Sequence, residues 1–182
     1  GLDNAGESLG LTGPADGGGI AVLQSFAFDD VAPWPLEADG AGHSLTRVEG
    51  TGDPADPANW RMSIATNGTP GGTDSQHFSG DPHADLDANG RPDLLDHAMP
   101  GGEVWLVRAD GGLEILFDRR LAADDAVCVP EWSDNLAGWS PLDAATERAP
   151  GALLPGGLWM ENWRPQSASP TSRYFRVRVH PR

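Results

Sequence analysis

The residues best suited to bind a metal ion lie in one short stretch, 85–96, which reads DLDANGRPDLLD. Oxygen-bearing side chains occupy positions 1, 3, 5, 9 and 12 of these twelve residues, and a glycine occupies position 6. Calcium takes about six to eight hard oxygen ligands, so it suits a short loop that offers an oxygen at nearly every second residue. The spacing predicts a calcium site with these ligand residues: Asp85, Asp87, Asn89, Arg91, Asp93 and Asp96.

The residues between the acids also fit such a loop. Gly90 permits a sharp turn, because a residue without a Cβ adopts positive φ at low cost. Arg91 is expected to contribute its backbone carbonyl, and Pro92 is tolerated beside it because the ion needs no N–H there. Residues 93–99 have the composition of one or two helical turns, which would carry Asp96 back toward the ion. The simpler alternative is a polar turn before a short helix, with its carboxylates solvated.

Position 12 of the loop is Asp96, where an ordinary EF-hand has the longer Glu. The stretch resembles the dockerin-like and thrombospondin-type calcium loops, which end in Asp. A single loop with no second copy in the chain favours a structural site over a switch.

Composition excludes several classes of partner. The formal net charge is −15 and all twelve basic residues are arginine, so nucleic acid and anionic membrane surfaces are not expected partners. The sequence contains no run of 18 apolar residues, so no membrane span is predicted. The first residue is Gly1 rather than Met, which we interpret as the start of a processed product or of a segment of a longer chain. The lone Cys128 lies in an apolar run and is expected to be a buried core residue.

Residues 1–72 are expected to be β-rich, because short apolar runs alternate with glycine- and proline-rich turns. The predicted strands are 8–11, 20–28 and 42–48, and the second has apolar residues on both faces. Three separated motifs, 2–11, 42–47 and Trp60 with 68–71, resemble the second half of a bacterial lamin-tail domain. This resemblance implies an immunoglobulin-like β-sandwich that acts as an interaction module in secreted proteins.

The early strands of that sandwich have no counterpart in the chain, so the resemblance covers only part of the domain. A sandwich without these strands would expose unpaired edges, which native proteins avoid. We therefore expect the missing N-terminal strands, or a strand from a partner, to complete it.

Residues 103–182 are predicted to form a second β-region. Residues 103–108 and 113–118 flank a Gly-Gly turn and predict a hairpin, and later strands are expected at 126–129, 158–160 and 174–179. The last strand alternates apolar residues with tyrosine and arginine. The segments 131–139 and 173–179 resemble the C-terminal β-domain of large secreted bacterial proteins, which implies a fibronectin-like sandwich with no chemistry of its own.

The predicted fold is therefore mainly β, with two sandwich elements, 1–72 and 103–182, joined by residues 73–102, which hold the calcium loop and a short helix. The function that fits best is a non-enzymatic structural or interaction module of a secreted or cell-surface bacterial protein. Other surface proteins or polysaccharide are its expected partners.

Two alternatives remain. Seven tryptophans, among them Trp132, Trp139, Trp159 and Trp163, would suit a carbohydrate-binding module if they were exposed, although core packing is the simpler account. A metal-dependent hydrolase fragment is the second, because Asp81 and His83 form the Asp-x-His with which metallophosphoesterases begin their site. The further ligands of those enzymes do not follow in the sequence.

Overall fold

The computed structural model describes residues 5–48, 52–109, 112–165 and 173–182. They form two compact units, Gly1–Asp74 and Ser75–Arg182. The secondary structure is mainly antiparallel β, as predicted.

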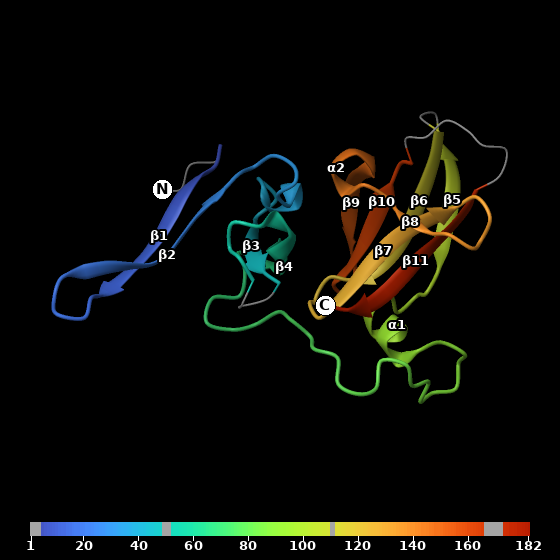
Figure 1. Ribbon diagram of the computed structural model, residues 1–182, viewed down its shortest axis with the longest axis horizontal. Coiled ribbons are helices and arrows are strands. Elements are labelled where there is room, and N and C mark those ends of the chain that lie inside the picture. Colours follow the sequence, from blue (N-terminus) through green and yellow to red (C-terminus); the bar gives the residue numbers. More distant parts are fainter. Residues whose placement is uncertain (1–4, 49–51, 110–111, 166–172) are drawn as a thin grey trace. The chain divides into compact units, whose positions relative to one another are not determined.

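The first unit contains four strands and two short 3-10 helices among its described residues (Figure 1). Its elements are β1 (Glu7–Pro14), β2 (Ile20–Phe28), η1 (Leu36–Ala38), β3 (His43–Arg47), η2 (Pro57–Asn59) and β4 (Trp60–Thr66). The strands pair as two separate two-stranded sheets, β1 with β2 and β3 with β4. The described part of this unit therefore contains no closed sandwich.

Aromatic packing and one buried ion pair hold the first unit together. The ring of Phe26 in β2 stacks on that of Trp60 in β4 at 5.1 Å between centroids. Arg61 is buried, and its Nη2 donates to Oδ1 of Asp74 at 2.8 Å. Oδ2 of Asp74 also accepts from the backbone N–H of Ile64 at 2.9 Å. Burial alone would raise the pKa of Asp74, but these donors outweigh it and lower that pKa.

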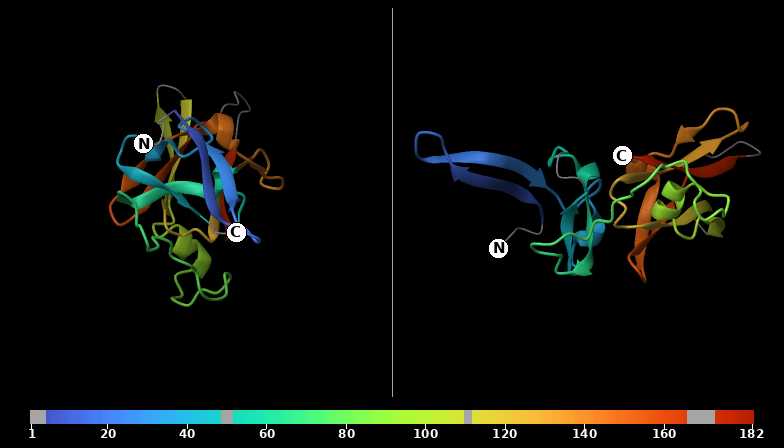
Figure 2. Two further views of the ribbon diagram at one scale, coloured as in Figure 1. Left: turned by 90° about the vertical axis from the view of Figure 1, so that its left-hand side faces the viewer. Right: turned by 90° about the horizontal axis from the view of Figure 1, so that it is seen from below.

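The second unit is a β-sandwich with one helix at its end (Figures 1 and 2). Its elements are α1 (Asp93–Ala98), β5 (Val104–Ala109), β6 (Gly112–Arg120), β7 (Ala126–Ser133), β8 (Ser140–Pro141), α2 (Ala144–Glu147), β9 (Arg148–Leu154), β10 (Leu158–Trp163) and β11 (Tyr174–Pro181). One sheet has the order β5-β6-β10-β9 and the other β11-β7-β8. Strands form at all five predicted places, 103–108, 113–118, 126–129, 158–160 and 174–179, and the first of them begins at Val104.

The core lies between these two sheets. Ile115 and Phe117 of β6 and Trp163 of β10 are buried in it, and Phe175 and Val177 of β11 pack against them. Cys128 packs against this cluster, as predicted for a core residue, and is partly buried. Burial raises the pKa of its thiol to about 11, so the thiol is protonated at neutral pH.

Helix α1 closes one end of the sandwich. Leu94, Ala98 and Met99 are buried, and the last two belong to the core cluster. The carbonyl of His97 accepts from Nε of Arg120 at 2.9 Å, which fixes the helix to β6. At six residues α1 is the longest described helix, and none of the described helices is long and apolar enough to cross a membrane.

Candidate calcium loop

The stretch 85–96 folds into a tight turn around the carboxylate of Asp85. Its Oδ1 accepts from the backbone N–H of Asn89 at 3.0 Å, and its Oδ2 accepts from that of Gly90 at 2.8 Å. Gly90 has φ of 87°, the left-handed region in which a glycine is favoured. The turn expected at this residue therefore forms, and the first acid of the loop faces inward.

Two further acids converge on the side chain of Asn89. Its Nδ2 donates to Oδ2 of Asp87 at 3.0 Å and to Oδ2 of Asp96 at 2.8 Å. Asp87 and Asp96 thus meet from opposite ends of the loop, with a polar N–H group between them. Four of the six predicted ligand residues, Asp85, Asp87, Asn89 and Asp96, are brought together in this way.

Asp93 takes a different position. Its Oδ1 accepts from the backbone N–H of Leu86 at 3.0 Å, and its own N–H donates to the carbonyl of Ala84 at 2.6 Å. These two bonds tie the start of α1 to the start of the loop. Asp93 therefore closes the base of the loop and does not join the group around Asn89.

The side chain of Arg91 has a role that the sequence analysis did not assign. Its Nη2 lies 3.0 Å from Oδ1 of Asp96 and donates to the carbonyl of Met99 at 2.6 Å. Gly102, with φ of 63°, leaves the space for it, because a Cβ there would overlap the guanidinium. Arg91 thus connects the carboxylate of Asp96, which is part of α1, to the backbone of Met99, which follows α1 and lies in the core.

The donor set fits a hard cation. Carboxylate and amide oxygens are what calcium prefers, and the turn at Gly90 directs them to one side. Among the described residues, however, no three His, Cys, Asp or Glu side chains already stand at metal-binding distances from one another. Calcium binding would require the amide of Asn89 to turn away from Asp87 and Asp96.

Two buried acids in the sandwich, each paired with two arginines, were not predicted from the sequence. Glu161 accepts from Nε of Arg119 at 2.6 Å and from Nε of Arg148 at 3.0 Å. Glu131 accepts in the same way from Arg176 and Arg178, each at 2.8 Å. Burial would raise the pKa of both acids, but the arginines outweigh it and lower both pKa values.

These acids have structural rather than catalytic surroundings, since each carboxylate is occupied by its arginines. The alternation in 174–179 was the available signal, because it placed two arginines on one face of β11. It did not identify Glu131 as their partner.

The residues of the hydrolase alternative do not converge. The carboxylate of Asp81 accepts from the backbone N–H of His83 at 2.9 Å, and both residues are exposed. This contact is a local turn. His77 lies elsewhere, beside Asp125, where its Nδ1 is 3.8 Å from the carboxylate.

The tryptophans are mostly covered. Trp159 and Trp163 are buried, while Trp132 and Trp139 lie under the guanidinium groups of Arg173 and Arg176 at 4.0 and 4.1 Å from their ring centroids. Trp105 is the one described tryptophan among the exposed large hydrophobic residues. The described tryptophans therefore provide no row of exposed rings on which a sugar chain would stack.

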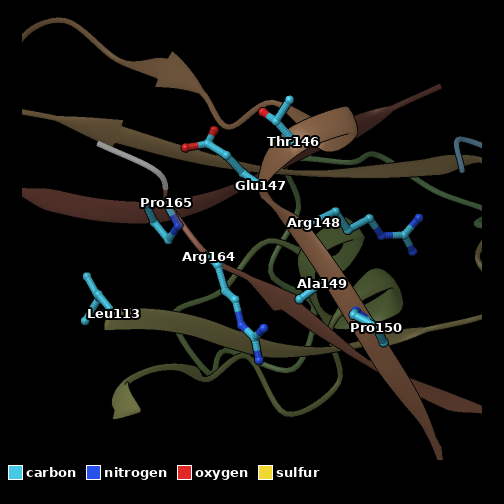
Figure 3. Close-up of a pocket in the computed structure, with 8 residues that line it drawn as sticks. All are labelled: Leu113, Thr146, Glu147, Arg148, Ala149, Pro150, Arg164 and Pro165. Carbon is cyan, nitrogen blue, oxygen red and sulfur yellow. The ribbon is translucent and has the colours of Figure 1, made fainter. Parts of the chain in front are cut away.

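A pocket of about 510 Å³ lies where α2, β9 and the end of β10 meet (Figure 3). Its charged lining residues are Glu147, Arg148 and Arg164, and the two arginine side chains point in different directions. Arg148 is paired with Glu161, and Arg164 with Glu114 at 2.7 Å. The pocket thus shows no converging set of acid, base and nucleophile among its described residues.

The loop at 85–96 remains the best candidate for a functional site. Comparison with known proteins finds no match to any family model, curated protein or solved structure.

Proposed function

We propose that the chain is a non-catalytic structural module of a secreted or cell-surface bacterial protein, in which loop 85–96 binds one structural calcium ion. The observation that carries this proposal is the convergence of Asp87 and Asp96 on Asn89 within a loop that Asp85 already turns inward. The resemblance of residues 1–72 to a lamin-tail domain and of the C-terminal region to fibronectin-like domains supports an extracellular setting.

Calcium would replace the Asn89 amide N–H donor between the two carboxylates. Asp85, Asp87, Asp96 and the Asn89 amide oxygen would supply ligands. The carbonyl of Arg91 would add another, and Asp93 would contribute through a water. We expect this solitary, solvent-exposed loop to bind calcium in the range of extracellular modules, with Kd on the order of 10⁻⁴–10⁻³ M.

The ion would stiffen the connection between the loop and the sandwich. Leu94, Ala98 and Met99 of the adjoining helix segment are buried in the second unit, and Arg91 links Asp96 to the carbonyl of Met99. A bound ion that fixes Asp96 therefore also fixes the end of α1. The role that follows is mechanical, since no group in the loop is placed to do chemistry on a substrate.

We also propose that a further β-strand completes the first unit, from an upstream segment or from a partner. The hairpin β1–β2 supports this proposal, because it pairs with no third strand among the described residues and a two-stranded ribbon gains little stability from its own contacts.

Isothermal titration calorimetry of chelator-treated protein tests the calcium proposal. We expect a one-site calcium isotherm, with magnesium at least about ten-fold weaker because it demands a smaller octahedral cage. Asp87→Ala should abolish the heat. Asp81→Ala is the matched control, because this exposed acid precedes the loop and bonds only to its own turn. No saturable calcium heat in the unaltered protein, or the same isotherm in Asp87→Ala, would refute the proposal.

A further inference from the structure

The hairpin β1–β2 exposes four large aliphatic side chains near its tip. Leu11, Ile20, Val22 and Leu23 are 61%, 81%, 66% and 62% exposed. Four such side chains gathered at one end of a hairpin indicate an interaction site. Figure 1 shows the hairpin extending away from β3 and β4 of its own unit, which agrees with the exposure of its tip.

The exposed side chains lie on both faces of the ribbon. Leu23 is the extra residue of a bulge, since Val22 and Gln24 pair with the consecutive residues Thr12 and Leu11. The Leu23 side chain covers Gly13, whose Cβ would lie 2.7 Å from its Cδ1, so it shares a face with Leu11. Val22 and Ile20 occupy the other face. Apolar residues on both faces of a strand are typical of a sheet that is covered on both sides.

Apart from the bulge at Leu23, the free edge of β2 carries none of the features that protect edge strands. Its sequence, IAVLQSFAF, contains no charge, glycine or proline, whereas β1 contains Glu7, two glycines and Pro14. Among the described residues β2 pairs with β1 alone. The bulge at Leu23 bends β2 but leaves 24–28 in regular register. The backbone groups on the outer side of β2 are therefore available to another strand.

The charges around the hairpin indicate what kind of strand would pair with β2. Asp16 lies in the turn at the tip, Asp29 and Asp30 follow β2 at the base, and residues 1–46 contain no lysine or arginine. A second copy paired antiparallel along β2 would bring Asp16 of each chain against the basal acids of the other. A parallel arrangement would place each acid against its own copy. Both repel, so the charges disfavour self-association and favour a strand with basic ends.

We propose that β2 is a strand-addition edge for an extended segment of a partner protein, with apolar side chains at alternate positions and lysine or arginine at both ends. This proposal rests on the proposed completion of the first unit by another strand, and it does not depend on calcium. If no peptide binds to β2, calcium binding at loop 85–96 is unaffected. If calcium does not bind, strand addition at β2 is unaffected.

Two synthetic peptides of alternating threonine and valine test it, one with two lysines at each end and the other with two glutamates. Binding is followed by amide chemical shifts and hydrogen exchange of β2 in the whole chain. We expect the lysine peptide to slow exchange at the β2 amides that do not bond to β1. The glutamate peptide should bind about ten-fold more weakly, and salt should reduce this difference.

Val22→Lys and Val31→Lys form a matched pair of variants in the same unit, since Val22 and Val31 are 66% and 57% exposed. Val22→Lys should weaken binding of the lysine peptide about ten-fold, and Val31→Lys should leave it unchanged. Both should melt like the unaltered protein, because neither valine is buried. The proposal is overturned if neither peptide binds or if both bind equally. It is also overturned if sedimentation shows a dimer that Val22→Lys disrupts, which would assign the edge to a second copy.

Discussion

Calcium should raise the melting temperature of the sandwich unit, and alanine at Asp85 or Asp96 should remove this effect. A ligand that binds only the folded state at about 100 times its Kd adds about 2.7 kcal/mol to the free energy of unfolding. Because the unit spans Ser75–Arg182, an increment of that size corresponds to a rise of about 10 °C for a domain of about 100 residues. With a Kd of about 10⁻⁴ M, calcium at about 10 mM reaches this condition.

The assay is differential scanning calorimetry in calcium and in chelator, with the difference compared between variants. Using the difference matters because Asp85 also accepts two backbone N–H groups, so Asp85→Ala destabilises the loop without any ion. Asp81→Ala serves again as the control and should retain the full rise. An equal rise in Asp85→Ala, Asp96→Ala and the unaltered protein would refute the reasoning, because the stabilisation would then arise elsewhere.

Three further predictions concern the sandwich. Glu161→Gln should lower the free energy of unfolding by about 2 kcal/mol at pH 7. Because the pKa of Glu161 is depressed in the fold, its contribution to the free energy of unfolding is present above about pH 4.3 and is lost as the pH falls. The melting temperatures of variant and parent should therefore converge in acid, and a constant difference between them across this pH range would contradict the prediction. Gly151→Ala should cost about 1–3 kcal/mol in chemical denaturation because its methyl group would overlap the backbone carbonyl of Met160 and the ring of Trp159. Gly138→Ala, in open space, should be near neutral, and equal effects of the two substitutions would refute these contacts. Cys128 should resist iodoacetamide at pH 7.5 until the protein unfolds, since burial raises its thiol pKa to about 11; rapid labelling of the folded protein would contradict that environment.

Strand β11 shows what alternation along a strand predicts well. Apolar residues at every second position placed Phe175 and Val177 on one face and Arg176 and Arg178 on the other, and the first pair packs against the core. The period of two is a property of the strand itself, so it needs no knowledge of the neighbouring strand. The partner of the arginines, Glu131, depends on the pairing of β11 with β7, and distant register is set by tertiary packing.

In the candidate loop, too, local features were predicted from the sequence and long-range contacts were not. Spacing alone predicted the turn at Gly90 and the helical turns after it, because both follow from local backbone preferences. It did not predict that the Arg91 side chain bridges Asp96 and the carbonyl of Met99. That contact depends on how α1 docks on the sandwich and on the space at Gly102, which are properties of the folded unit.

The first unit was predicted less completely. Residues 20–28 form the strand expected there, and apolar residues on both of its faces were apparent in the sequence. The pairing of β3 with β4, and the buried contact between Arg61 and Asp74, were not predicted. Arg61 is a charged residue within a strand, and its buried guanidinium is paired with Asp74, which lies at the end of the unit and far from it in the sequence.

The measurement that tests the calcium proposal most directly is a crystal structure of the protein grown with calcium at about 10 mM, with any ion in the loop identified by anomalous scattering. We expect one ion with oxygen ligands at about 2.3–2.6 Å, from the side chains of Asp85, Asp87, Asn89 and Asp96 and the carbonyl of Arg91. An ordered loop without an ion, in which Nδ2 of Asn89 still donates to Asp87 and Asp96, would contradict it.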